Sequence, residues 1–243
     1  AKHVDFLVPN RFKHGYGLSP EIVKEAKRDK EPDLIITVDN GISSNEGAEL
    51  ARSLGIDVII TDHHLPPNEL PNANAIINPN LRGCDFPSKN LAGVGVCFYL
   101  FSSLKTYLTK QGYFEKNNIQ NPDLRTLLDL VALGTVADVV KLDQNNRILV
   151  NEGIKRIREK RCSKGILAIL ELTKRPVDSL QASDLGFTVA PRINAAGRLS
   201  DISQGIRCLL SDDMNDARRY AQTLEEFNIK RRKEQTRMQD EAL

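Results

Sequence analysis

Three neighbouring residues with reactive side chains, Asp62, His63 and His64, directly follow an apolar run. A second carboxylate, Asp39, follows another apolar run in the same way. Carboxylates that are crowded together repel one another unless a cation lies between them. Mixed carboxylate and imidazole donors suit a divalent ion such as Mn²⁺ better than Ca²⁺, which prefers oxygen ligands. These residues indicate a metal site, and the alternative is a polar loop that contains two histidines.

Two predicted β-strands, at residues 34–38 and 57–61, would position these side chains. Both are apolar or β-branched runs, and an amphipathic helical pattern that ends at Gly55 separates them. Continuous apolar strands joined through helices are typical of a parallel sheet buried on both faces. The predicted fold class is therefore α/β, with a parallel β-sheet and flanking helices. Because ligands bind beyond the carboxyl ends of such strands, the two polar strand ends are expected side by side.

Further elements are predicted on either side of these strands. Residues 3–9, HVDFLVP, have the composition of a short strand, and Ser19 followed by Pro20 forms a helix start. Pro66 and Pro67 follow the second strand, and they are expected to prevent a return to regular structure there.

A third carboxylate, Asp138, stands alone in the apolar stretch LVALGTVADVVKL. Burying an unpaired charge is costly, so this side chain needs a partner. A metal ion, a neighbouring arginine or a helix N-terminus would each serve. Taken together with Asp39 and the Asp-His-His run, Asp138 favours the metal site. We expect Asp39, His63 and Asp138 to converge on a common point.

The second half of the sequence is predicted to be helical. From about Leu91 onward the segments have helical patterns, and no glycine or proline follows Gly205. The segment from about Asp213 therefore predicts one long, highly charged helix, with apolar residues at helical spacing only in its first half. We expect that half to pack on the core. The predicted domains are a core at residues 1–205 and a connector helix at residues 206–243.

Composition places the chain among ordinary globular proteins. Of its 243 residues 40% are hydrophobic and 27% are charged, and the net charge is +2, so any nucleic-acid site must be a local basic patch. The four cysteines form no CxxC pair, which favours reduced thiols and a cytoplasmic location. The sequence contains no apolar run of the ~20 residues that a membrane span needs, so no membrane partner is expected.

Several motifs carry a family resemblance. TDHH at residues 61–64, VDNGISS at 38–44 and LGTVADVV at 133–140 resemble three motifs of the DHH phosphoesterase superfamily. PNRFKHGYGLSPE at 9–21, LAGVGV at 91–96 and APRINAAGRLSD at 190–201 are similar to its RecJ-type branch of bacterial single-stranded-DNA-specific 5′→3′ exonucleases. The resemblance runs along essentially the whole chain.

The resemblance implies a phosphodiesterase that uses two Mn²⁺ or Mg²⁺ ions in DNA repair and recombination. By correspondence of motifs, Asp39 is the bridging carboxylate, and His63 and Asp138 are further metal ligands. His64 would face the scissile phosphate, and Asp62 would support the two histidines from behind. The implied partner is single-stranded DNA, with a single-strand-binding protein and a helicase as possible protein partners.

Two basic segments are candidate DNA contacts. Arg192, Asn194 and Arg198 are interspersed with small residues, so they could surround a phosphate closely, whereas the alternative is a helix-capping loop with surface arginines. Arg11 could line the path of the strand, and Tyr16 between two glycines is a stacking candidate or a turn-packing residue.

One family feature has no counterpart in the sequence. The first motif of the family, a DxDxDG-like strand end, is missing, as are the glycine-rich second domain and the oligonucleotide-binding domain. We therefore expect a core fragment with a partial metal set that is inactive by itself. Two other functions remain open: a DHH-type enzyme that cleaves short oligonucleotides or cyclic dinucleotides, and a catalytically silent DNA-binding relative.

Overall fold

The computed structural model describes residues 3–9, 14–199 and 202–241, and it divides the chain into two compact units. Unit 1 comprises Ala1–Leu124 and Val140–Asn146, and unit 2 comprises Arg125–Val139 and Arg147–Leu243. Each unit has its own cluster of buried apolar side chains. Among the helices described, none combines the length and the apolar character needed to cross a lipid bilayer.

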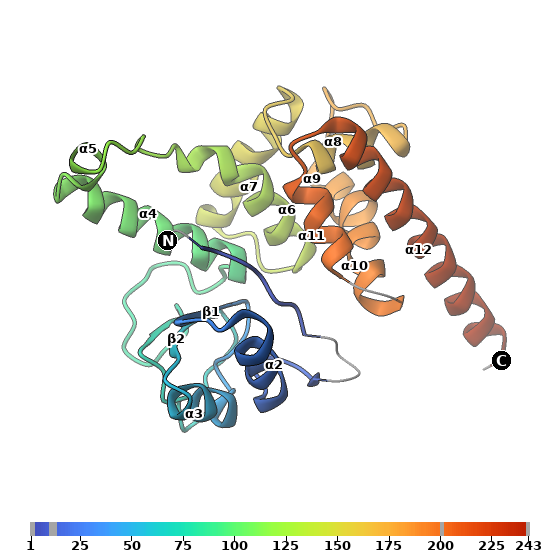
Figure 1. The fold of residues 1–243 in the computed structure, drawn as a ribbon. Coiled ribbons are helices and arrows are strands. Elements are labelled where there is room, and N and C mark those ends of the chain that lie inside the picture. Colours follow the sequence, from blue (N-terminus) through green and yellow to red (C-terminus); the bar gives the residue numbers. More distant parts are fainter. Residues whose placement is uncertain (1–2, 10–13, 200–201, 242–243) are drawn as a thin grey trace. The chain divides into compact units, whose positions relative to one another are not determined.

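Unit 1 contains a parallel sheet of three strands in the order β1-β2-β3 (Figure 1). The strands are β1 (Leu34–Val38), β2 (Asp57–Thr61) and β3 (Ala75–Ile77). Val38 pairs with Thr61, and Thr61 pairs with Ile77, so all three strands end at the same edge. The predicted parallel sheet with flanking helices is confirmed.

Two helices of unit 1 have the predicted ends. In α2 (Pro20–Lys30), the Ser19 hydroxyl accepts a hydrogen bond from the backbone N–H of Ile22, which satisfies one of the free donors of the first turn. Helix α3 (Asn45–Ser53) is followed by Gly55 with a φ of +71°, a left-handed conformation that glycine adopts without strain. The buried cluster of unit 1 joins α2 and α3 to β2 through Ile22, Ala51 and Ile60.

Two sequence predictions about unit 1 were wrong. Residues 3–9, all of which are described, form no strand. Conversely, β3 forms after Pro66 and Pro67, because backbone pairing with β2 stabilises a segment of only three residues. Neighbouring hydrogen bonds support this pairing: the N–H of Asn74 donates to the carbonyl of Val58, and the N–H of Asp62 donates to that of Ile77.

The remaining elements are helices, as predicted for the chain from about Leu91 onward. Unit 1 also holds α4 (Gly93–Lys110) and α5 (Tyr113–Lys116), and η1 (Leu124–Leu127) lies at the boundary of the units. Helix α7 begins in unit 1 and continues in unit 2, and the other helices after η1 belong to unit 2. These elements are α6 (Leu128–Ala137), α7 (Gln144–Arg158), α8 (Lys164–Leu172), α9 (Ala182–Asp184), the π-helix η2 (Leu185–Val189), α10 (Ala190–Leu199), α11 (Ser203–Leu210) and α12 (Met214–Glu241).

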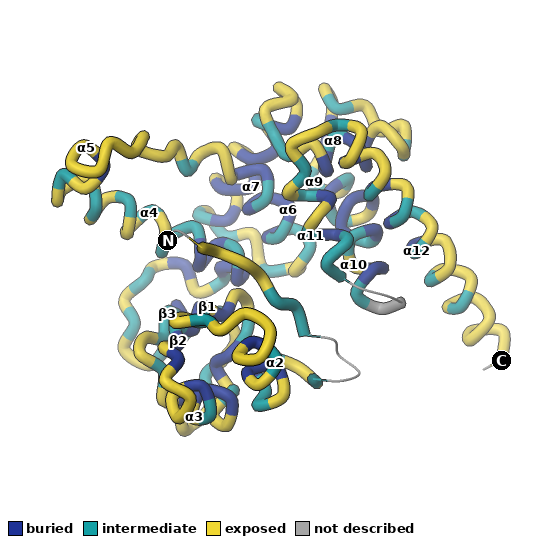
Figure 2. Tube along the Cα trace, viewed as in Figure 1, coloured by how far each residue is buried: buried dark blue, intermediate teal, exposed yellow. Residues whose placement is uncertain are grey.

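Helix α12 confirms the prediction of a single long helix with a packed first half. Ala217, Ala221 and Leu224 are buried in the apolar cluster of unit 2. Ile229, by contrast, is 45% exposed, and the residues beyond it are exposed or half-buried (Figure 2). The second half therefore gains little from packing, and its role as a connector to a further domain stays a prediction.

Replacement of Ile60 by Ala tests the sheet core. The side chain is fully buried, so truncation should lower the free energy of unfolding by about 2–5 kcal/mol. Ile36→Ala in β1 is the matched control, because Ile36 is 42% exposed and its truncation should cost less than about 1 kcal/mol. Urea unfolding followed by circular dichroism measures both, and equal losses would contradict this account of the core.

Candidate metal centre

Asp39 and the Asp62–His64 run extend the ends of two neighbouring strands. The N–H of Asp39 donates to the carbonyl of Thr61 at 3.0 Å, which continues the pairing of β1 with β2 by one residue. Asp39 has a φ of +68°, a left-handed conformation that costs a non-glycine residue roughly 1–2 kcal/mol. Such strain is concentrated at functional sites, where surrounding contacts hold it in place.

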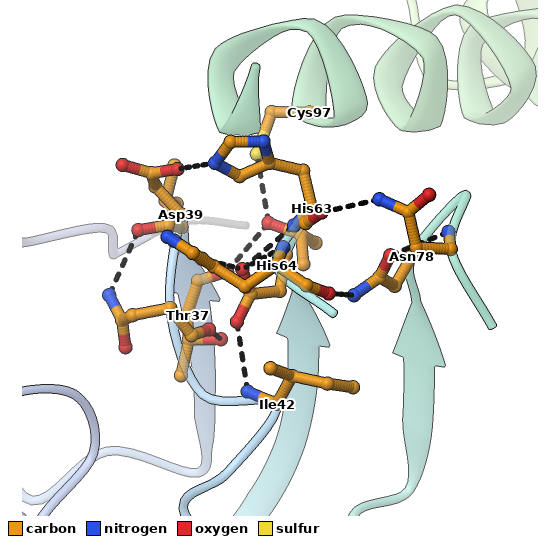
Figure 3. A network of polar contacts seen from close by, with 12 residues as sticks. Thr37, Asp39, Ile42, His63, His64, Asn78 and Cys97 are labelled. Carbon is orange, nitrogen blue, oxygen red and sulfur yellow. Dashed lines mark hydrogen bonds and ion pairs between the residues drawn. The ribbon is translucent and has the colours of Figure 1, made fainter. Parts of the chain in front are cut away.

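Asp39, His63 and His64 come together as predicted (Figure 3). Nε2 of His63 lies 3.0 Å from Oδ1 of Asp39. Within the described part of the chain, one donor atom from each of the three residues lies within 4.8 Å of the other two. The His63 side chain is largely buried, whereas the side chains of Asp39 and His64 are about half exposed and face solvent. The cluster is therefore accessible to an ion or a substrate.

Asp62 lies behind the cluster and, at 1% exposure, is more buried than any of its three residues. Its Oδ2 accepts a hydrogen bond from the backbone N–H of Ile42, and its Oδ1 accepts from the backbone N–H groups of His63 and His64. Burial by itself would raise the pKa of Asp62, but these bonds and the contact with the His64 ring outweigh it and lower the pKa below the usual value. The carboxylate is thus kept ionised inside the protein.

The ring of His64 is oriented by Asp62. Nδ1 of His64 lies 2.7 Å from Oδ1 of Asp62, and an ionised carboxylate only accepts, so Nδ1 carries the proton. The lone pair of the neutral ring is then on Nε2, the atom available to a ligand. A carboxylate behind a histidine is the usual way in which proteins fix the tautomer of a metal-binding or catalytic imidazole.

Two supporting residues, Asn78 and Asn80, were missed at the level of sequence. The side-chain amide of Asn78 donates to the carbonyl of His64 at 2.8 Å, and that of Asn80 donates to the carbonyl of His63 at 2.6 Å. They follow β3, whose formation was not predicted. The available signal was the pair of asparagines in INPN, immediately after the short apolar run Ala75–Ile77.

The donors present fit a divalent metal ion. Metal–nitrogen and metal–oxygen bonds are about 2.0–2.2 Å long, so two ligands of one ion lie at most roughly 4.4 Å apart. The observed spread of the donor atoms is close to this span. The buried, hydrogen-bonded Asp62 supplies the support behind the ligands that such sites need.

Asp138 lies in unit 2, at the carboxyl end of α6. Its N–H donates to the carbonyl of Gly134 at 3.0 Å. The next residue, Val139, has a φ of +59°, which is strained for a β-branched side chain and marks a sharp end to the helix. The convergence of Asp138 with Asp39 and His63 stays a prediction.

The arginine-rich segment at residues 190–201 forms a helix where it is described, rather than a loop. The guanidinium of Arg192 is buried, with Nε 2.5 Å from Oε2 of Glu225 in α12 and Nη1 2.7 Å from the carbonyl of Thr188. Asn194 is exposed. The side chain of Arg198 lies outside the described part. Arg192 is thus engaged within unit 2, and its contact with phosphate stays a prediction.

The structure describes only one of the two predicted DNA contacts near the N-terminus. Arg11 lies outside the described residues. Tyr16 is 80% exposed, between Gly15 and Gly17 with φ values of +69° and +74°. This exposure leaves the ring accessible to a base, and the role of Tyr16 in stacking stays a prediction.

Comparison with known proteins places this site in context. A family model described as "DHH family, N-terminal domain" matches residues 1–135. The chain is 58% identical over 243 residues to the single-stranded-DNA-specific exonuclease RecJ of Escherichia coli (strain K12), covering 100% of this chain and 42% of the relative. It is 39% identical over 243 residues to the protein of the same name from Bacillus subtilis (strain 168), covering 100% and 29%. The chain therefore spans less than half the length of these relatives.

Solved structures show the same fold. The crystal structure of exonuclease RecJ bound to manganese has a TM-score of 0.78 and 34% identity, covering 96% of this chain and 55% of that chain. The crystal structure of RecJ from Thermus thermophilus in complex with Mn²⁺ has a TM-score of 0.74 and 32% identity, covering 90% and 31%.

Replacement of Asp62 by Asn tests the support behind the cluster. The NH₂ group of an asparagine cannot accept a hydrogen bond, so at least one N–H group that now donates to the carboxylate would lose its acceptor. We therefore expect a loss of about 2–3 kcal/mol in the free energy of unfolding of metal-free protein at pH 7. Asp33→Asn, at the opposite end of β1 and exposed, is the matched control.

The loss caused by Asp62→Asn should depend on pH with a definite sign. The folded state lowers the pKa of Asp62, so its stabilisation is full above the unfolded value of about 4 and is lost as pH falls through the folded value. The difference between wild type and variant should shrink below about pH 4. Urea titrations at several pH values measure it, and a constant difference would argue against an ionised Asp62.

Proposed function

The chain belongs to the DHH family, and from that membership and the geometry of its metal centre we propose that the whole protein is a metal-dependent single-stranded-DNA-specific 5′→3′ exonuclease of DNA repair and recombination. The observation that carries the proposal is the accessible cluster of Asp39, His63 and His64 backed by the buried Asp62. The relatives named as such exonucleases support it along the full length of the chain.

Asp39 and His63 are the proposed metal ligands of unit 1, and Asp138 is the proposed ligand from unit 2. Mn²⁺ or Mg²⁺ is the proposed ion, and RecJ structures with each of them support this choice. A divalent ion would supply an activated water nucleophile and neutralise charge on the attacking and leaving oxygens of the phosphodiester. Asp39 holds its carboxylate toward His63 at 3.0 Å, so the two side chains are already oriented for a common ligand.

His64 is proposed to act on the scissile phosphate. With Nδ1 held by Asp62, the ring presents Nε2 outward, as either a hydrogen-bond acceptor or, when protonated, a donor. A protonated ring would place a positive charge and a donor beside the phosphate oxygens, where negative charge develops in the transition state. Asp62, which stays ionised, holds the ring in this orientation.

The DNA strand is proposed to contact Arg11, Tyr16, Arg192, Asn194 and Arg198. Exposed Tyr16 would stack a base, and exposed Asn194 would donate to a backbone oxygen. Arg192 would have to exchange Glu225 for phosphate, so its contribution depends on the bound state. A single-strand-binding protein and a helicase are the proposed protein partners, and the cytoplasm is the proposed location.

A substrate panel tests this function in the full-length protein. With Mn²⁺, we expect release of nucleotides from the 5′ end of single-stranded DNA, and no comparable hydrolysis of cyclic dinucleotides. Preferred hydrolysis of cyclic dinucleotides would favour the other phosphodiesterase function, and DNA binding without hydrolysis would favour a silent relative. Residues 1–243 alone are expected to degrade DNA negligibly, and robust degradation by them would contradict this part of the proposal.

Replacement of single ligands tests the site itself. Asp39→Asn and His63→Ala should each lower Mn²⁺-dependent hydrolysis by about 100-fold or more, because even supporting residues of metal sites are worth roughly 10- to 100-fold. Asp33→Asn, at the amino end of the same strand as Asp39, should leave the rate unchanged. Rates within twofold of wild type for the Asp39 variant would exclude it as a ligand.

The second half of α12 generates a separate prediction about DNA. It carries four consecutive basic residues, Lys230, Arg231, Arg232 and Lys233. Their neutralisation in the full-length protein should weaken single-strand binding. The slope of log affinity against log salt should fall by up to about 0.7 for each phosphate that the variant no longer neutralises. Fluorescence anisotropy at several salt concentrations measures the slope.

A charge-matched control separates local contacts from net charge. It neutralises four exposed lysines on other elements, Lys110, Lys116, Lys155 and Lys160. The slope should not change in this control. An equal change in both variants would mean that only overall charge matters, and an unchanged slope in the α12 variant would leave this helix as a solvated spacer.

A further inference from the structure

The amino-terminal turn of α4 lies against the ends of β1 and β2. Thr61 donates its hydroxyl proton to the carbonyl of Thr37, so the Cys97 thiol donates to Oγ1 of Thr61, 3.0 Å away. Figure 3 shows Cys97 reaching from α4 toward the residues of the metal centre. Gly93 lies one helical turn before Cys97, on the same face of the helix. This face therefore lies over the carboxyl edge of the sheet.

Gly93 approaches Asp39 so closely that no side chain fits between them. A Cβ atom at position 93 would lie 2.3 Å from Oδ1 of Asp39, 2.5 Å from its Cβ and 2.7 Å from its Cα. Oδ1 is the same atom that faces Nε2 of His63 at 3.0 Å. An added methyl group at Gly93 would therefore displace the carboxylate oxygen that the metal centre uses.

Asp39 has little freedom to adapt by moving its backbone. Its N–H is paired with the carbonyl of Thr61, and its φ of +68° already lies in a strained region. The next turn is also held, since the hydroxyl of Thr37 donates to the carbonyl of Asn40 at 2.6 Å. Rotation of the Asp39 side chain would move only its carboxylate, because its Cβ and Cα would still lie 2.5 and 2.7 Å from the new atom. A clash at Gly93 would consequently be relieved by displacement of Asp39 as a whole or by withdrawal of α4.

We infer that Gly93 is a positioning residue of the metal centre, which lets α4 close on Asp39 and holds its carboxylate toward His63. The inference rests on the proposed metal site, because it assigns Gly93 a role in the geometry of one of its ligands. Helix formation does not require glycine at this position, since alanine is the better helix former. The three atoms nearest to an added Cβ all belong to Asp39, so the requirement comes from this contact.

Gly95 provides a matched control within the same turn of α4. A Cβ there would meet Cδ2 of Leu91 at 3.0 Å, and the end of a leucine side chain can move by the few tenths of an ångström required. Gly93→Ala and Gly95→Ala thus make the same chemical change on one helix, and only the first touches Asp39.

The test measures Mn²⁺ affinity of the full-length protein by isothermal titration calorimetry, together with thermal unfolding of the metal-free protein. Gly93→Ala should weaken Mn²⁺ binding by about 10- to 100-fold, as loss of support behind metal ligands does. Gly95→Ala should stay within about twofold of wild type. If Gly93→Ala lowers the unfolding temperature and leaves Mn²⁺ affinity unchanged, the glycine serves packing only and the inference is wrong.

Asp39→Asn separates this inference from the proposed function. Unchanged Mn²⁺ affinity in that variant would overturn the metal site itself. Weakened binding in Asp39→Asn with wild-type binding in Gly93→Ala would overturn only the role of Gly93.

If Gly93→Ala does not fold, the same substitution in an Asp39→Gly variant tests the inference. Asp39→Gly removes the Oδ1 and Cβ atoms that the new methyl group would meet and leaves only the contact with Cα at 2.7 Å. Glycine tolerates the φ of +68° and gives the backbone freedom to relieve that contact. Gly93→Ala in this background should fold, as judged by circular dichroism and a cooperative unfolding transition. Failure of the double variant to fold would show that the backbone at position 39, rather than the carboxylate of Asp39, excludes a side chain at position 93, and would refute the inference.

Discussion

The buried carboxylate of Asp62 is the interaction on which the rest of the site depends. A charge at 1% exposure is stable only when its oxygens are occupied, and here three backbone N–H groups and one imidazole occupy them. Those donors belong to the loop after β1 and to the residues after β2. The same carboxylate therefore joins two strand ends and sets the direction of both histidines.

Strain at Asp39 fits this arrangement. A left-handed aspartate is unfavourable in isolation, but the pairing with Thr61 and the close approach of Gly93 hold it. The result is a carboxylate whose position is set before any ligand arrives. Preorganisation of this kind avoids the cost of ordering ligands upon metal binding.

Unit 2 is organised by a different buried charge. Arg192 in α10 and Glu225 in α12 form a largely buried pair, which Arg192 extends to the carbonyl of Thr188 in the π-helix. Breaking such a pair on one side leaves an uncompensated charge, so the pair couples the arginine-rich segment to the long helix. Among the residues described, no comparable buried ion pair joins α12 to the other helices of unit 2 beyond Ile229.

The sequence by itself determined the strands β1 and β2, their parallel pairing, most helices and the grouping of Asp39 with His63 and His64. These follow from local patterns, because apolar runs, caps and glycine stops act over a few residues. Only the tertiary structure decided that β3 forms, that Asn78 and Asn80 hold the histidine backbone, that Arg192 is paired with Glu225 and that Gly93 touches Asp39. Each of these depends on contacts between segments far apart in the chain. The local sequence carries almost no signal for a three-residue strand, for a single asparagine or for a glycine. The role of each depends on the residue that it contacts in the folded protein.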